Sequence, residues 1–171
     1  MAIDRSMPVL VVDDYVTMIN VIRSQLRQLG FIDVDEANSG AEALTKICVR
    51  RYGLILSDWH MEPITGFDLL TAIRGDVSLK QTPFIMVTGE SRSENVVAAK
   101  KAGVNGYIVK PFTAQMLKAK IESVFATRTS PLADRQAVGV PLAAPSGEAS
   151  GATPNSEAFQ LKFPGRFTGG S

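Results

Sequence analysis

The chain has 171 residues, of which 45% are hydrophobic and 20% charged, and its formal net charge is +1. This length suits one domain of about 120–150 residues with a tail, and such a domain buries enough surface to fold without metal or disulfide. The near-zero net charge argues against a nucleic-acid-binding protein, which usually carries a cluster of basic residues.

The N-terminal half alternates between short apolar runs and segments with helical periodicity. The run Val9–Val12 predicts a strand, because apolar residues without alternation are typical of strands covered on both faces. Apolar residues then recur every three or four positions over Met18–Leu29, which predicts a helix. Ile32–Glu36 alternates in polarity and predicts a strand at an edge of the sheet. A second helix is expected over Ala41–Arg51, with Ser39 near its N-cap.

The next part of the chain continues this alternation. Three more strands are predicted by the apolar runs Leu54–Leu56, Phe84–Val87 and Tyr107–Val109. Three more helices are expected to begin at Phe67, at Ser93 and at Ala114, the last two ending near Ala102 and Phe125. The fivefold repetition of strand and helix predicts a doubly wound α/β fold with a five-stranded parallel sheet and five helices.

The composition changes near residue 126. Beyond this point Ala, Gly, Pro, Ser and Thr dominate, whereas Ile, Met, Tyr and Trp are absent. Such a segment buries too little apolar surface to offset the entropy of ordering its backbone. The sequence therefore predicts one folded domain over residues 1–126 and a low-complexity, disordered tail over residues 127–171.

Three aromatic residues of the tail, Phe159, Phe163 and Phe167, follow one another at four-residue intervals. A helix would align the three rings on one face, but Pro164 and Gly165 interrupt such a helix. Docking onto a partner and an inert extension both stay open for this segment.

The expected compartment is the cytoplasm. Cys48 is the only cysteine, so an internal disulfide is excluded and a reducing environment is expected. No segment is apolar over the roughly 20 residues that a membrane-spanning helix requires. The first residues also lack the apolar segment of a signal peptide.

Polar residues follow four of the predicted strands. In an open parallel sheet, ligands bind at the carboxyl ends of the strands, so these residues are expected to meet there. In chain order they are Asp13 and Asp14, then Asp58, then Thr88 and Glu90, and finally Lys110.

Three carboxylates at one place repel one another, and this repulsion favours a bound cation. Mg²⁺ suits such a site, because it accepts one or two carboxylates together with waters and a phosphate oxygen. Lys110 adds a fixed positive charge and Thr88 a hydroxyl donor, both of which suit a phosphoryl group. The combination predicts a phosphoryl site with a magnesium ion rather than a set of unrelated helix caps.

These segments resemble the receiver domains of two-component response regulators, most closely the stand-alone receivers of chemotaxis. The resemblance covers about residues 8–125 and rests on Val11–Asp14, Ser57–Trp59, Met86–Glu90 and Gly106–Phe112. It implies a flavodoxin-like fold and a single-domain response regulator, which is a phosphoacceptor switch and not an enzyme.

The resemblance also implies which residues carry the reaction. Asp58 is the expected phosphoacceptor, which receives a phosphoryl group from a donor phosphohistidine. Asp13, Asp14 and Asp58 are expected to hold Mg²⁺, together with the backbone carbonyl of His60.

Further residues are expected, by the same resemblance, to sense or modulate the phosphoryl group. Thr88 is expected to hydrogen-bond it and Lys110 to pair with it. Tyr107 is expected to change rotamer as Thr88 moves. The side chains of His60 and Glu90 are expected to modulate hydrolysis of the acyl phosphate.

The sequence departs from the family pattern in the loop after the phosphoacceptor. Glu62 stands where proline is usual, Pro63 follows it, and Thr65 stands where an acidic residue is common. These changes are expected to alter the loop path and the Mg²⁺ affinity rather than phosphorylation itself. As in the family, the Lys110–Pro111 peptide bond is expected to be cis.

The resemblance implies protein partners on both sides of the reaction. A histidine kinase or a phosphotransfer protein is the expected phosphodonor, and the downstream partner is expected in the flagellar motor or in a kinase pathway. No nucleic-acid or membrane partner is expected, and the unphosphorylated chain is expected to be a monomer. The expected partner surface includes Lys100, Lys101, Val104, Tyr107 and Lys118.

Three other functions are possible for such a fold. An aspartyl-phosphate phosphatase would need a second carboxylate to protonate its leaving group, where this chain has Trp59 and His60 after Asp58. A flavodoxin-like cofactor binder would need a Gly-rich phosphate loop after the first strand, which is missing. A receiver fold that binds partners without phosphorylation remains the main alternative.

Overall fold

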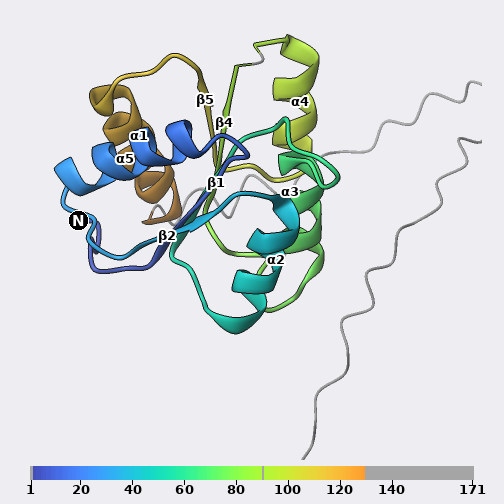
Figure 1. The fold of residues 1–171 in the computed structure, drawn as a ribbon, viewed down its shortest axis with the longest axis horizontal. Helices are drawn as coiled ribbons and strands as arrows, with labels where there is room; N and C mark the ends of the chain where they lie inside the picture. Colours follow the sequence, from blue (N-terminus) through green and yellow to red (C-terminus); the bar gives the residue numbers. More distant parts are fainter. Residues whose placement is uncertain (1, 90, 130–171) are drawn as a thin grey trace, which may run out of the picture. The chain divides into compact units, whose positions relative to one another are not determined.

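The structure is a computed structural model that describes residues 2–89 and 91–129. Within these residues, five parallel strands form one sheet in the order β2-β1-β3-β4-β5. The strands are β1 (Val9–Val12), β2 (Val34–Ala37), β3 (Leu54–Ser57), β4 (Phe84–Thr88) and β5 (Gly106–Val109). The helices are α1 (Val16–Gln28), α2 (Gly40–Val49), α3 (Gly66–Gly75), α4 (Ser93–Lys101) and α5 (Ala114–Thr129). Strand and helix alternate along the chain (Figure 1), which confirms the predicted flavodoxin-like, doubly wound α/β fold.

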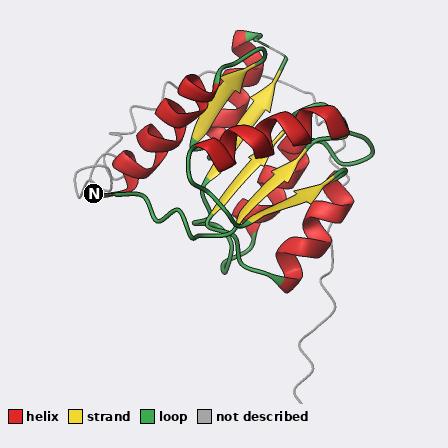
Figure 2. Ribbon diagram, turned by 60° about the vertical axis from the view of Figure 1, so that its left-hand side comes forward, coloured by secondary structure: helices red, strands yellow, loops and turns green. Residues whose placement is uncertain are grey.

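Helices cover both faces of the sheet. α1 and α5 lie on one face and α2, α3 and α4 on the other (Figures 1 and 2). In β1, Val9 and Val11 belong to the core beneath α1 and α5, whereas Leu10 and Val12 belong to the core beneath α2 and α3. All four side chains are fully buried. A strand covered on both faces needs an apolar residue at every position, which explains the unbroken apolar runs in the sequence.

Side-chain caps determine where two of the helices begin. Ser39 accepts a hydrogen bond from the backbone N–H of Glu42 at 3.1 Å and caps α2, as predicted. Thr113 accepts one from the backbone N–H of Met116 at 3.2 Å, at the first turn of α5. Each bond satisfies an N–H group that has no partner within the helix. In the part of the chain that the structure describes, no helix is long and apolar enough to cross a membrane.

The edge strand β2 begins two residues later than its alternating pattern predicts. Its partner is β1, and the pairing starts where Val9 lies opposite Val34. The carbonyl of Asp33 accepts a hydrogen bond from the backbone N–H of Val9 at 2.9 Å. Ile32 precedes this bond and is 78% exposed, so the apolar residue that suggested a longer strand lies in the loop.

α5 continues to Thr129, four residues beyond the predicted end at Phe125. The guanidinium of Arg128 donates a hydrogen bond to the backbone carbonyl of Gln81, in the loop before β4. The two residues of this contact are far apart in the sequence, so local composition does not reveal it. Residues 127–129, which the composition assigned to the tail, therefore belong to α5, whereas the rest of the predicted tail with its three Phe residues lies outside the described part.

A half-buried arginine near the end of α3 connects this helix to the loops before β4 and β5. Arg74 donates from Nε to the carbonyl of Gly103 at 2.9 Å and from Nη1 to that of Thr82 at 2.8 Å. Its Nη2 donates to Oδ1 of Asn105 at 2.7 Å, and this oxygen also accepts from the backbone N–H of Phe84 at 2.9 Å. Burial, and to a smaller extent the charge of Arg128, lowers the pKa of the Arg74 guanidinium. Arg74 thus fixes the start of β4, which carries Thr88, and the start of β5, which Lys110 follows.

Replacing this arginine with lysine tests whether the three bonds stabilise the fold. Arg74→Lys leaves one ammonium for three separate acceptors, so we expect the free energy of unfolding to fall by about 2 kcal/mol. The measurement is urea unfolding followed by circular dichroism. Arg51→Lys is the control, because Arg51 makes one exposed bond, to the carbonyl of Ser78, and should cost less than about 0.5 kcal/mol. Equal losses in the two variants would contradict this role of Arg74.

Candidate functional site

Three carboxylates lie together at the carboxyl edge of the sheet. β1 and β3 are neighbours, and their register places Val12 opposite Ser57, so the next residues of both strands lie side by side. Those next residues are Asp13 and Asp58, and one oxygen each of Asp13, Asp14 and Asp58 lies within 4.8 Å of the other two. Asp13 and Asp58 are buried, whereas Asp14 is exposed.

Lys110, the residue after β5, reaches two of these carboxylates. Its Nζ lies 2.8 Å from Oδ2 of Asp13 and 3.3 Å from Oδ1 of Asp58. Its backbone N–H donates to the carbonyl of Thr88 at 2.8 Å, which joins β5 to the end of β4. The Lys110–Pro111 bond is cis, as predicted. One ammonium faces three carboxylates, so the cluster keeps an excess of negative charge.

The environment of Asp58 disfavours its negative charge. Burial raises the pKa of the Asp58 carboxyl, and the nearby charge of Asp13 raises it further. The ammonium of Lys110 and a hydrogen bond from the backbone N–H of Trp59 act in the opposite direction. The net shift is upward, which means that one ammonium does not fully compensate for the desolvation of this carboxylate.

The donor set fits Mg²⁺. This ion binds oxygen ligands and uses one or two carboxylates together with waters or phosphate oxygens. Asp13, Asp14 and Asp58 offer carboxylate oxygens close enough to share one ion. A divalent cation would also offset the negative charge that Lys110 leaves uncompensated. The structure therefore brings together the three side chains that the sequence predicts as metal ligands.

The other predicted site residues occupy different positions around this cluster. Thr88 ends β4 and is fully buried. Tyr107 in β5 is half-buried and packs against the core beneath α2 and α3. The side chain of His60 is exposed in the loop that follows Asp58. Glu90 lies outside the described residues.

The loop between β3 and α3 shows how the chain accommodates its departures from the family pattern. The Glu62–Pro63 bond is cis, and both residues are exposed. Thr65 caps α3 by accepting from the backbone N–H of Asp68 at 3.1 Å, while the Asp68 carboxylate accepts from the backbone N–H of Thr65 at 3.0 Å. This reciprocal capping box gives Thr65 a structural role. The spacing of Thr65 and Asp68 in the sequence is the signal that could have revealed it.

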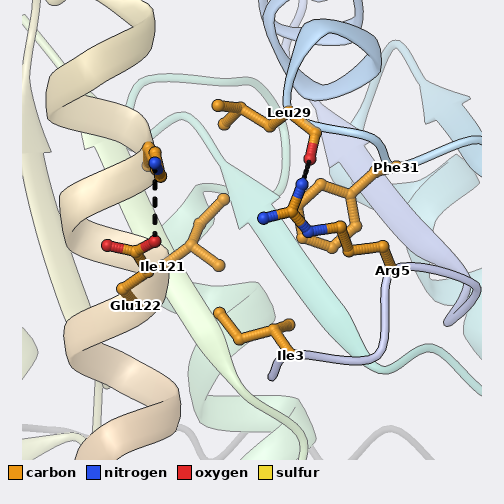
Figure 3. A pocket seen from close by; sticks show the side chains of 7 residues that line it. Ile3, Arg5, Leu29, Phe31, Ile121 and Glu122 are labelled. Carbon is orange, nitrogen blue, oxygen red and sulfur yellow. Dashed lines mark hydrogen bonds and ion pairs between the residues drawn. The ribbon is translucent and has the colours of Figure 1, made fainter. Parts of the chain in front are cut away.

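A small pocket elsewhere in the molecule contains none of the residues predicted for phosphorylation. It lies between the N-terminal segment and α5, as Figure 3 shows, and Arg5 donates to the carbonyl of Leu29 at its rim. Lys118 also lines it and lies 3.9 Å from the carboxylate of Glu122. Lys118, which the sequence analysis placed on the partner surface, therefore lies beside the N-terminal segment.

Comparison with known proteins agrees with this geometry. The response regulator receiver domain family matches residues 9–122. The chain is 47% identical over 119 residues to the chemotaxis protein CheY of Pseudomonas aeruginosa. The aligned region covers 70% of this chain and 96% of that protein. It is 42% identical over 123 residues to the chemotaxis protein CheY-3 of Vibrio cholerae, and this alignment covers 72% of the chain and 95% of that protein. The crystal structure of CheY4 of Vibrio cholerae is similar, with a TM-score of 0.65 and 34% identity over 70% of this chain and 98% of that one.

The chain therefore belongs to the family of response regulator receiver domains. This confirms the resemblance that the sequence motifs indicated and the assignment to two-component signalling.

Removing one negative charge tests whether the carboxylates repel one another. We expect Asp14→Asn to raise the melting temperature of the metal-free protein by about 2 °C, because Asp14 is exposed and contributes mainly repulsion. Asp13→Asn should raise it less, since Asp13 also pairs with Lys110 and accepts from the backbone N–H of Tyr15 at 2.9 Å.

Differential scanning calorimetry with and without Mg²⁺ provides the measurement and its control. The wild-type chain should gain stability when Mg²⁺ is added, and both variants should gain less. A lower melting temperature of metal-free Asp14→Asn would show that these carboxylates are satisfied within the fold and do not destabilise it.

Proposed function

We propose that the chain is a response regulator that accepts a phosphoryl group on Asp58 from a histidine kinase or a phosphotransfer protein. The observation that carries the proposal is the position of the Asp58 carboxylate. It is buried directly after the end of β3, 3.3 Å from the ammonium of Lys110 and next to Asp13. This is an oxygen nucleophile in a site with one fixed cation and ligands for a second.

The reaction that fits this arrangement is phosphoryl transfer. A carboxylate oxygen of Asp58 attacks the phosphorus of a phosphohistidine, the P–N bond breaks, and the imidazole leaves with a proton from solvent. The product is an acyl phosphate on Asp58. Such reactions depend mainly on positioning and on neutralising the charge of the phosphoryl oxygens.

The residues of the chain provide most of this positioning and charge neutralisation. Lys110 lies close enough to Asp58 to pair with a phosphoryl oxygen, and Thr88 at the end of the neighbouring strand offers a hydroxyl. Asp13, Asp14 and Asp58, with the backbone carbonyl of His60, would hold Mg²⁺. The ion would neutralise negative charge on the transferring oxygens.

The response would be read by a protein partner at the surface formed by α4, β5 and α5. β5 connects this surface to the site, because Tyr107 lies three residues before Lys110. A partner that prefers the phosphorylated arrangement would shift the population toward it. Exposed apolar and basic side chains on these elements include Val97, Lys100, Lys101, Val109 and Met116.

Chemotaxis is the proposed pathway. Two relatives that the chain resembles over almost their whole length are named chemotaxis proteins. The downstream target would then be the flagellar motor or a kinase pathway. A receiver that binds partners without phosphorylation is the alternative, and the experiment below separates the two.

Intact mass spectrometry tests the proposal. The chain is incubated with acetyl phosphate, with and without Mg²⁺, and compared with Asp58→Asn. We expect a Mg²⁺-dependent gain of one phosphoryl group in the wild-type chain and none in the variant. Asp76→Asn is the control, because Asp76 lies after α3 and bonds to Ser78, and it should be phosphorylated like the wild type.

Two results would contradict the proposal. Phosphorylation of Asp58→Asn would mean that another residue is the acceptor. No phosphorylation of the wild-type chain, although calorimetry detects Mg²⁺ binding, would favour the phosphorylation-independent interaction module.

A further inference from the structure

The first residue of α3 lies directly against the backbone of the proposed phosphoacceptor. The backbone N–H of Gly66 donates to the carbonyl of Trp59 at 2.9 Å. A Cβ placed on Gly66 would lie 1.9 Å from the carbonyl oxygen of Asp58 and 2.9 Å from its carbonyl carbon. Non-bonded carbon atoms normally stay roughly 3.5–4.0 Å apart, so any side chain at Gly66 would displace this part of the chain.

The backbone conformation does not explain this glycine. Gly30 and Gly103 have φ angles of 94° and 92°, which other residues rarely adopt. Gly66 is not among the positive-φ glycines and begins an α-helix. Alanine is a better helix former than glycine, so helix propensity does not explain the glycine either. The requirement for glycine therefore comes from the close approach of Asp58.

A second contact holds the same carbonyl group. Oγ of Ser57 donates a hydrogen bond to the carbonyl oxygen of Asp58 at 2.9 Å, and both residues are buried. The Cβ position of Gly66 also lies 3.0 Å from Sδ of Met86 in β4. The backbone of Asp58 is thus confined between β3, β4 and α3, and it cannot move away from an added methyl group without leaving its place beside Lys110.

We propose that Gly66 is a positioning residue for phosphorylation of Asp58. Because Gly66 has no side chain, the backbone of Asp58 can lie directly against the first turn of α3. In this position the Asp58 carboxylate lies beside Lys110 and Asp13. The inference rests on the proposed function, since it assumes that Asp58 is the acceptor. A displacement of about 1 Å at a reacting group can reduce the rate about 100-fold.

The chain contains a matched control for this steric effect. Gly40 is the first residue of α2, and a Cβ there would lie 2.7 Å from the carbonyl oxygen of Ile64 and 2.8 Å from its side chain. Ile64 belongs to the loop that follows Asp58, but to its far end. Gly40→Ala therefore crowds the same loop without touching the phosphoacceptor. Gly75→Ala, at the end of α3, is the neutral control, because a Cβ there meets nothing within 4 Å.

The experiment measures three quantities in the full chain carrying Gly66→Ala, Gly40→Ala or Gly75→Ala. They are the melting temperature, the rate of phosphorylation by acetyl phosphate, and the affinity for Mg²⁺. The metal titration uses the fluorescence of Trp59, the only tryptophan, which follows Asp58 and stacks on Phe67 at 5.3 Å. Metal affinity is a readout of the position of Asp58 that does not depend on phosphoryl transfer.

We expect Gly66→Ala to lose about 100-fold in rate and to bind Mg²⁺ more weakly, and Gly40→Ala to stay within about threefold of the wild type in both. Both variants should lose melting temperature, Gly66→Ala more than Gly40→Ala, because the Cβ at Gly66 would lie 1.9 Å from a backbone oxygen and that at Gly40 2.7 Å. Gly75→Ala should match the wild type in rate and in Mg²⁺ affinity and should not lower the melting temperature.

Three results would overturn the proposal. They are a rate of Gly66→Ala within about threefold of the wild type, equal losses of rate in Gly66→Ala and Gly40→Ala, and unchanged Mg²⁺ affinity in Gly66→Ala. If the wild-type chain is not phosphorylated at all, the proposed function fails, and the metal titration alone decides whether Gly66 positions Asp58.

Ser57→Ala keeps the proposal testable if Gly66→Ala does not fold. This variant removes the second contact to the Asp58 carbonyl and adds no bulk. We expect a folded protein that loses about 10-fold in rate and binds Mg²⁺ more weakly. A folded Ser57→Ala with wild-type rate and affinity would overturn the inference.

Discussion

The ion pairs of Lys110 with Asp13 and Asp58 are the interaction on which the site depends. Lys110 Nζ lies 2.8 Å from Asp13 and 3.3 Å from Asp58, and Asp14 adds a third carboxylate to the cluster. One ammonium reduces the repulsion of the buried carboxylates but does not cancel it, as the raised pKa of Asp58 indicates. The fold therefore holds a site whose charge favours the arrival of a cation, and the binding of a phosphoryl group would follow from the same electrostatics.

The topology of the sheet brings these residues together and connects them to the surface. β1 and β3 are adjacent, so Asp13 and Asp58 lie side by side, and β5 follows β4 at the edge. The central strands are covered by helices on both faces, which leaves their carboxyl ends as the place where polar residues can gather. β5 carries Tyr107 towards the proposed partner surface and is followed by Lys110 in the site. A single edge strand can thus couple charge at Asp58 to the surface that a partner contacts.

The sequence predicted the sheet and the acidic cluster because both depend on local patterns combined with one topological rule. Unbroken apolar runs locate the buried strands, and the polar residues directly after them must lie at the carboxyl edge. The start of β2 and the end of α5 could not be predicted in this way. They depend on tertiary hydrogen bonds, between Val9 and Asp33 and between Arg128 and Gln81. The role of Gly66 was missed for a similar reason, since its contact with Asp58 depends on how the loop closes.

The central claim is that the acidic cluster is the phosphorylation site. A crystal structure of the chain in complex with Mg²⁺ and beryllium trifluoride, which mimics a phosphoryl group, tests this claim most directly. We predict that the metal is bound by Asp13, Asp14, Asp58 and the backbone carbonyl of His60. We also predict that the beryllium bonds to a carboxylate oxygen of Asp58 and that its fluorides contact Lys110 and Thr88. A metal bound away from these carboxylates, or beryllium trifluoride bonded to another residue, would contradict the assignment of this cluster as the phosphorylation site.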